Sequence, residues 1–222
     1  MPGIALALVE QAPDIVALSE YRRATGGQIA GILADRGLSH QADSGPEPGE
    51  NGLLIASRYP LLGEPSSITT AGVATGRALI VRTACAAVVC VHGPSSGTGA
   101  ARSVFWRALV TAVKPLADSA SLIVGDFNTG RDRLDREDGR FKSAGFLGEL
   151  AGLGYVDVWR AGNPDGREAS WESHSRRGFR IDHVLASRDL AGKCGDSGYI
   201  HRWREAKLSD HSPVYADFSG VF

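Results

Sequence analysis

Four short polar segments, spread along the whole chain, constrain this sequence more than any other feature. Three of them follow or open an apolar, β-branched run (residues 14–18, 121–124 and 181–186), and such runs are typical of buried strands. A rigid scaffold holds polar residues at strand ends, so we expect the four segments to converge. In chain order they are Ser19-Glu20, Gly125-Asp126-Phe127-Asn128, Arg180-Ile181-Asp182-His183 and Ser209-Asp210-His211. One glutamate, three aspartates, an asparagine and a histidine would then form an oxygen-rich pocket with a titratable base, which suits Mg²⁺ or Mn²⁺ and the hydrolysis of phosphoesters.

Length and composition favour a single domain outside the membrane. With 222 residues, 43% of them hydrophobic, the chain can bury one sizeable core, and we expect residues 1–222 to form one domain. No apolar run approaches the ~18 residues that cross a bilayer, and the start lacks the basic region of a secretion signal. Cys85, Cys90 and Cys194 cannot all pair and have no zinc-like spacing. Free thiols in the cytoplasm are the expected state.

The charge balance limits how the chain could bind nucleic acid. A formal net charge of −1 excludes a surface that is positive throughout, so any nucleic-acid contact needs a local basic patch. Arginine far outnumbers lysine, and arginine suits bidentate phosphate contacts. The abundance of alanine, glycine and arginine equally fits a GC-rich genome.

Predicted strands outnumber predicted helices. We expect helices at 4–11, 24–36, 101–117 and 141–153, strands at 15–18, 52–56, 78–83, 86–91, 121–125, 180–186, 197–203 and 213–218, and loops at 44–49, 94–99 and 130–140. Some adjacent strands are too close for a crossover helix between them. This pattern predicts an α+β domain in which a two-sheet β-sandwich is flanked by helices, in four layers α/β/β/α.

Each polar segment alone has a simple structural explanation. Asp126 and Asn128 could satisfy their own backbone in a tight turn, and residues 209–213 could be an ordinary turn before a strand. Taken together and in this order, the segments resemble the endonuclease/exonuclease/phosphatase superfamily over essentially the full chain. The matching pieces are residues 18–20, 51–58, 125–128, 180–187 and 209–214. The resemblance implies a two-sheet sandwich and hydrolysis of phosphoesters with Mg²⁺, for which Mn²⁺ could substitute.

The resemblance also implies roles for the residues of the site. Glu20, Asp210 and Asp126 would offer carboxylate oxygens to the metal ion. His211 would take a proton from the attacking water or position it, and Asp182 would hold the imidazole in the right tautomer. Asp126 is assigned in this superfamily either as the group that activates water or as the acid for the leaving group.

Further residues would contact the substrate. Asn128 would donate a hydrogen bond to a phosphate oxygen, and His92 would contact phosphate unless it only bonds its own turn. From the matching segment 51–58, Asn51 and Arg58 would also bind substrate. His183 follows Asp182 on a strand, so it should point to the opposite face and into the packing.

The last third of the chain resembles bacterial exonuclease III and the abasic-site endonucleases. The matching pieces are Ser170-Trp171 and residues 176–182, 185–191 and 209–218. In those enzymes the tryptophan lines the pocket for a sugar that lacks a stacked base; the alternative for Trp171 is simple packing. Arg176 and Arg180 would bind a DNA backbone beside it.

The expected function is therefore that of a metal-dependent DNA phosphodiesterase. We expect a 3′→5′ exonuclease with abasic-site or 3′-end-processing activity in DNA repair. The alternatives are a phosphomonoesterase or phospholipid-headgroup hydrolase of the same superfamily, and a degenerate domain that only binds.

One departure from the superfamily pattern concerns the first strand. In that pattern a strand ending in asparagine precedes the helix that here begins at Ile4. We expect its slot to be empty, with Ile15, Val16 and Ala17 at an exposed edge, or filled by a neighbouring chain. The protein would be a monomer in the first case and a dimer in the second.

Overall fold

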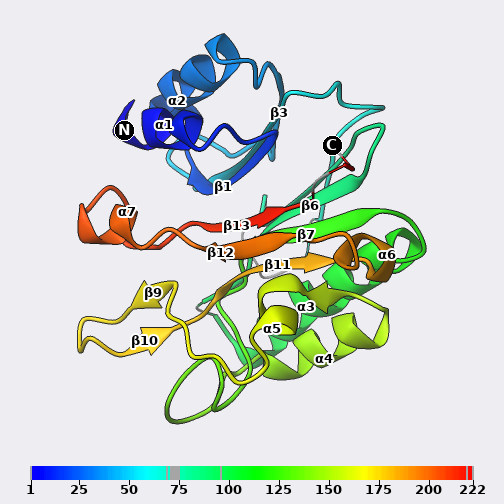
Figure 1. The fold of residues 1–222 in the computed structure, drawn as a ribbon, viewed down its shortest axis with the longest axis vertical. Helices are drawn as coiled ribbons and strands as arrows, with labels where there is room; N and C mark the ends of the chain where they lie inside the picture. The colour runs from blue at the N-terminus through cyan, green and yellow to red at the C-terminus, as the bar shows by residue number, and fades with distance from the viewer. Residues whose placement is uncertain (1, 69, 71–75, 96, 219, 222) are drawn as a thin grey trace.

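The larger of two β-layers is a six-stranded sheet that runs through the middle of the molecule (Figure 1). The computed structural model describes residues 2–68, 70, 76–95, 97–218 and 220–221. In sheet order the strands are β4 (Ser66–Ser67), β5 (Ala78–Arg82), β6 (Ala87–His92), β7 (Ser121–Asp126), β11 (Asp182–Ala186) and β8 (Val156–Asp157). Strands β6 and β7 are parallel, and the other neighbours are antiparallel. We call this the large sheet.

The second β-layer consists of two separate pieces. One is a three-stranded sheet in the order β1 (Ile15–Tyr21), β3 (Gly52–Ser57) and β2 (His40–Asp43); the other is the pair β12 (Asp196–Tyr199) and β13 (Val214–Asp217). Strand β1 packs on β6 and β7, and β13 packs on β11. Both pieces thus cover the same face of the large sheet.

Helices cover the outer faces of both layers, at the top and bottom of Figure 1. Helices α1 (Pro2–Glu10) and α2 (Arg23–Asp35) bury Ala5 and Leu33 against the second layer. On the other side, α3 (Gly99–Val113) and α4 (Ala144–Gly152) bury Trp106 and Leu150 against the large sheet. The predicted four-layer α/β/β/α sandwich is confirmed.

Short elements complete the fold. They are the 3₁₀ turn η1 (Lys114–Leu116), the helices α5 (Val158–Gly162), α6 (Arg188–Ala191) and α7 (Arg202–Glu205), and the hairpin of β9 (Trp171–Glu172) with β10 (Gly178–Phe179). Among the helices that the structure describes, none is long and apolar enough to span a bilayer.

Two strands of the second layer, β12 and β2, differ from the sequence-based expectation. The strand expected at 197–203 ends at Tyr199, because its pairing with β13 ends there and α7 begins three residues later. Strand β2 was missed because it reads His-Gln-Ala-Asp and buries only Ala42, so it lacks an apolar pattern.

The second layer has a gap between its two pieces. Within the described residues β1 pairs only with β3, and β13 pairs only with β12, so each leaves one edge unpaired. A cleft of about 1470 Å³ is lined by Ala17 of β1, Ala216 of β13, and Leu122, Val124 and Val184 of the large sheet below. This cleft therefore lies between two open strand edges.

The prediction that β1 forms an edge is confirmed for its backbone. Its side chains are less exposed than expected: Val16 is only 4% exposed, and Ile15 and Ala17 are half-buried because they pack on the core between the layers. Whether the protein is a monomer or a dimer stays a prediction.

Candidate active site

Three neighbouring strands of the large sheet bring three polar residues into one row. His92 ends β6, Asp126 ends β7 and Asp182 begins β11. The register places His92 opposite Asp126, and Asp126 opposite Asp182. All three are buried, with exposed fractions of 9%, 6% and 8%. The sheet itself therefore assembles the centre of the site, as the strand-end positions predicted.

Gly125 sets a close spacing between two backbones of this row. Its φ is +133°, and a Cβ added there would lie 2.1 Å from the carbonyl oxygen of Val91 on β6. Only glycine allows β6 and β7 to approach so closely at the end that carries Asp126.

His211 is paired with Asp182. The imidazole Nδ1 lies 2.8 Å from Asp182 Oδ2. Because a carboxylate can only accept, Nδ1 carries the proton and Nε2 remains for a further partner. This is the orientation that the sequence comparison implied for these two residues.

The imidazole of His211 carries a different charge from that of an unpaired histidine side chain. Burial lowers the pKa of His211, but the hydrogen bond and the charge of Asp182 outweigh it and raise the pKa to about 9. The ring is therefore an imidazolium at neutral pH. A cation with a free Nε2–H is suited to bind a phosphate oxygen rather than to accept a proton from water.

The pKa of Asp126 lies closer to neutral pH than that of His211. Burial and the neighbouring charge of Asp182 raise the pKa of Asp126 to about 8, although His211 and the amide of Asn128 oppose the shift. A carboxyl with a pKa near the working pH is well placed to give or take a proton. Of the two groups, Asp126 is thus the better candidate for proton transfer.

His92 is neutral in this setting. Burial, together with the nearby positive charges of Arg77 and His211, lowers the pKa of His92 to about 4. Its Nε2 lies 3.8 Å from Asp126 Oδ2, which is too long for a hydrogen bond. The predicted phosphate contact of His92 stays a prediction.

Asn128 orients Asp126 rather than facing a substrate. Its backbone N–H donates to Asp126 Oδ1 at 2.7 Å, and its side-chain amide donates to Asp126 Oδ2 and to the carbonyl of Gly93, both at 2.9 Å. Both side-chain N–H groups are thereby used. The expected donation from Asn128 to a phosphate oxygen is not supported by this arrangement.

Two exposed carboxylates, Glu20 and Asp210, line the same cleft as Asp126, Asp182 and His211. Glu20 has a φ of +58°, and the β1–β3 register shifts between Leu18 and Tyr21, so a bulge sets its direction. In the described part of the chain, no group of three or more His, Cys, Asp or Glu side chains is placed to hold a metal ion.

Mg²⁺ usually keeps several waters and binds one or two carboxylates together with substrate phosphates. Hard oxygen donors at an open position, such as Glu20 and Asp210, fit that mode of binding and do not form a closed cage.

Trp171 lies directly beside the His211–Asp182 pair. Its backbone forms an isolated antiparallel β-bridge with His211, and the centroids of the two side-chain rings are 6.4 Å apart. The indole also packs on the ring of Phe179, with 5.7 Å between the two ring centroids, and it is half-buried. Its position agrees with a wall of a substrate pocket as well as with packing.

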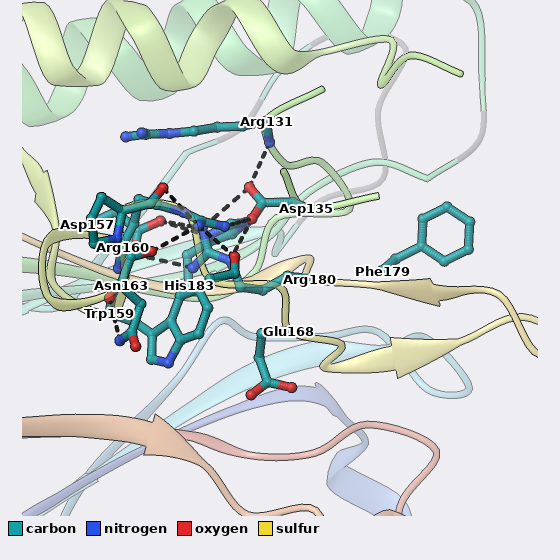
Figure 2. Close-up of polar contacts among 12 residues, drawn as sticks. Arg131, Asp135, Asp157, Trp159, Arg160, Asn163, Glu168, Phe179, Arg180 and His183 are labelled. Carbon is teal, nitrogen blue, oxygen red and sulfur yellow. Dashed lines mark hydrogen bonds and ion pairs between the residues drawn. The ribbon is translucent and has the colours of Figure 1, made fainter. Parts of the chain in front are cut away.

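Arg180 does not face the substrate. It is 0% exposed, with Nε 2.6 Å from Asp135 Oδ1 and Nη2 2.6 Å from Asp157 Oδ2 (Figure 2). Its guanidinium also lies over the Trp159 ring at 4.8 Å. The predicted substrate contact of Arg180 is wrong, because its guanidinium is buried in ion pairs with Asp135 and Asp157.

His183 belongs to the same buried network (Figure 2). It is 0% exposed, and its ring nitrogens contact Asp157 Oδ2 at 3.2 Å and the Thr129 carbonyl at 2.9 Å. Strand alternation correctly predicted that His183 points away from the face of Asp182.

Arg58 lies far from the site along β3. The β1–β3 register places Ser57 opposite Ile15 and Gly52 opposite Tyr21, so Arg58 lies at the end opposite Glu20. There its Nε donates to the carbonyl of Pro13 at 3.1 Å. The predicted role of Arg58 in substrate binding is wrong.

Asn51 and Arg176 remain open as substrate contacts. Asn51 is next to the Glu20 end of the sheet, and its Oδ1 accepts from Arg22 Nε at 2.6 Å. Arg176 is exposed in the turn between β9 and β10, with a φ of +55°. Both roles stay predictions.

Sequence analysis missed Arg77. Its Nη1 donates to the carbonyl of His92 at 3.2 Å, and the charges of Asp126 and Glu20 oppose the lowering of its pKa by burial. Arg77 directly precedes β5, so the rule that polar residues at strand ends form the site could have identified it.

We expect Asp182→Asn to destabilise the protein in a pH-dependent way. The pKa of His211 is raised above its ordinary value of 6.5, so the pair stabilises fully below that pH and loses its effect as pH rises through about 9. The difference in Tm between wild type and Asp182→Asn, measured without metal, should shrink between about pH 6 and pH 9.5. His174→Ala, at an exposed histidine, is the control. A difference that grows with pH would contradict the assigned proton.

Comparisons with known proteins agree with this arrangement. The sequence profile described as the Endonuclease/Exonuclease/phosphatase family matches residues 3–211. An exodeoxyribonuclease III from Haemophilus influenzae is 34% identical over 120 residues, which span 44% of this chain and 45% of that relative. The match therefore covers less than half of the curated relative.

Solved structures with the same fold cover nearly the whole chain. A 3′ phosphatase, NExo, from Neisseria bound to a product DNA hairpin has a TM-score of 0.86 at 22% identity, covering 98% of this chain and 93% of that one. The 3′-5′ exonuclease NExo from Neisseria meningitidis gives 0.85 at 23%, with coverages of 98% and 93%. An AP endonuclease from Archaeoglobus fulgidus gives 0.81 at 22%, with coverages of 97% and 93%.

Proposed function

The chain belongs to the endonuclease/exonuclease/phosphatase family, and we propose that it is a metal-dependent DNA phosphodiesterase of DNA repair. Its reaction would be 3′→5′ exonuclease cleavage with abasic-site or 3′-end processing. The observation that carries this proposal is the position of Trp171 against the His211–Asp182 pair, in a cleft that also holds Asp126. The names of the relatives, an exodeoxyribonuclease, an AP endonuclease and a 3′ phosphatase, support DNA as the substrate.

The phosphate would bind at the cationic side of the site. His211, charged and oriented by Asp182, would donate from Nε2 to a non-bridging oxygen. This contact strengthens as negative charge shifts onto the oxygens in the transition state. Arg77 adds a second positive charge behind His92.

Proton transfer would fall to Asp126. Asn128 donates hydrogen bonds to both carboxylate oxygens of Asp126, so the carboxylate is fixed before substrate arrives. Its raised pKa lets Asp126 exchange a proton with the attacking water or with the leaving oxygen near neutral pH. We therefore assign proton transfer to Asp126, and not to His211 as the family resemblance implied.

Glu20 and Asp210 would hold Mg²⁺, or Mn²⁺ in its place, at the open side of the cleft. When bound, the ion would neutralise charge on the phosphate. The two carboxylates contribute hard oxygen donors, and their exposure leaves room for water and substrate oxygens.

A nuclease assay tests this proposal. We expect a duplex with a recessed 3′ end, or one with a model abasic site, to be cleaved with Mg²⁺ or Mn²⁺ and to remain intact in excess EDTA. Glu20→Gln should raise the Mg²⁺ concentration needed for half-maximal rate, because a neutral amide binds a hard cation more weakly than a carboxylate. Undiminished cleavage in the chelator would overturn the metal assignment. Hydrolysis of only a phosphomonoester or a lipid headgroup would indicate the alternative substrates, and binding without turnover an inactive domain.

Trp171→Ala should distinguish a DNA-repair enzyme from a general phosphoesterase. If the indole shapes the pocket for an unstacked sugar, the variant should lose about tenfold more activity on abasic or 3′-end DNA than on a small p-nitrophenyl phosphodiester. The ratio of kcat/KM on the two substrates measures this effect. Equal losses on both substrates would assign Trp171 to packing against Phe179.

A further inference from the structure

Ser170 is a fully buried serine that contacts the backbone on both sides of the His211–Asp182 pair. It is 0% exposed and directly precedes β9. Its Oγ accepts the backbone N–H groups of Ile181 at 3.0 Å and Asp182 at 3.1 Å. Its carbonyl accepts the N–H of Ser212, the residue after His211, at 2.7 Å.

The hydroxyl of Ser170 is used completely. A serine hydroxyl offers one donor and two acceptor positions. Ser170 fills both acceptor positions with the two amides and donates to the carbonyl of Phe179 at 3.3 Å. A side chain that only filled space would not need three directed contacts, all to backbone atoms of the short segment 179–182 that leads from β10 into β11.

The two members of the pair come from distant parts of the chain. Asp182 and His211 are 29 residues apart, and their side chains still meet at 2.8 Å. Asp182 stands at the beginning of β11, and His211 lies in the segment between α7 and β13, outside both elements. A residue that binds both backbones can fix one relative to the other.

We propose that Ser170 is a positioning residue that sets the hydrogen bond between Asp182 and His211. Its side chain fixes the amide of Asp182, and its carbonyl fixes the amide that follows His211. Its neighbour Trp171 bridges to His211, so the same short segment also sets the indole. The catalytic consequence rests on the function proposed above, whereas the positioning of the pair does not.

Ser170→Ala tests this role against a matched buried serine. Ser121 is also 0% exposed and lies at the start of β7, whereas Asp126 ends that strand. Its Oγ is bonded to the carbonyl of Leu116 at 2.9 Å and to the hydroxyl of Tyr155 at 3.1 Å. Ser121→Ala therefore removes comparable buried hydrogen bonds without touching the site.

Two measurements separate positioning from stability. The first is the downfield imidazole proton of His211 Nδ1 in spectra of ¹⁵N-histidine-labelled protein, assigned by its loss in His211→Ala. The second is the split between kcat and KM on a DNA substrate. In Ser170→Ala we expect the proton signal to shift or vanish and kcat to fall about 100-fold with KM nearly unchanged, because misplacement by about 1 Å has that effect. In Ser121→Ala both should stay at wild-type values even where Tm falls.

Ser170→Cys provides a second variant of nearly the same size. Sulfur accepts hydrogen bonds poorly, so its imidazole signal and kcat should lie between those of wild type and Ser170→Ala. If Ser170→Ala does not fold, the comparison of Ser170→Cys with Ser121→Ala decides the question. A signal and a kcat in the Ser170 variants equal to those of Ser121→Ala would overturn the proposal. If wild type cleaves no DNA while the signal still responds to Ser170, the proposed function fails and the positioning role stands.

Discussion

Replacing His211 with alanine should lower kcat on DNA by about a thousandfold, the effect expected when a phosphoryl-transfer site loses an oriented charged group. The loss should fall on kcat more than on KM, because the contact from Nε2 strengthens as charge moves onto the phosphate oxygens. Single-turnover kinetics on a labelled duplex measure it. The fold should persist, because His211 is only partly buried and contributes little to the core.

Two other histidines serve as controls for this result. His174→Ala, at an exposed position, should leave both stability and kcat unchanged. His183→Ala should lower Tm more than kcat, because its ring is buried between Asp157 and the Thr129 carbonyl. Near-normal turnover in His211→Ala would mean that a group other than His211 stabilises the charge on the phosphate oxygens.

Asp135→Asn should cost about 3–5 kcal/mol of unfolding free energy, the range found when one partner of a buried ion pair is removed. The Asp135 carboxylate is 0% exposed and lies 2.6 Å from both Arg160 Nη2 and Arg180 Nε. Burial raises the pKa of Asp135, but the bonds from Arg180 outweigh it and hold the pKa below its usual value. An asparagine would leave two buried guanidinium groups short of negative charge and would turn an N–H group toward other donors.

Urea denaturation of the variants measures this loss. Asp138→Asn is the matched control from the same loop, because Asp138 and its partner Arg177 are 68% and 58% exposed and lie 3.4 Å apart. An exposed pair of this kind contributes about 0–1 kcal/mol. If both variants lose the same small amount of unfolding free energy, the buried network of Asp135, Arg160 and Arg180 does not stabilise the fold as its geometry indicates.

Strand pattern was sufficient to find the centre of the site. Asp126 follows an apolar run and Asp182 stands at the start of one, and the sheet register places the two residues side by side. The same alternation predicted that His183 points away from the site. The position of a residue at a strand end and the alternation of side chains are local properties, and local properties can be read from a single sequence.

The misassigned residues depend on contacts between distant segments. Arg180 was expected to bind DNA because it is an arginine next to Trp171 in a basic segment, but Asp135 and Asp157 bury it. Arg58 stands at the wrong end of β3, and only the register with β1 reveals this. The contacts of Asn128 with Asp126 and Gly93 were not predicted, because neither contact follows from residue type.

The gap between β1 and β13 has a consequence for the motions of the molecule. Glu20 lies on β1, and Asp210 precedes β13, so the two carboxylates line one cleft from separate pieces of the second layer. In the described residues no strand joins these pieces, and each can open locally at its own free energy. A ligand held by both carboxylates couples the two openings, because losing either piece releases it. Amide hydrogen exchange in β1 and β13 should then slow by the same factor when the site is filled, and the departure of product should loosen both strands together.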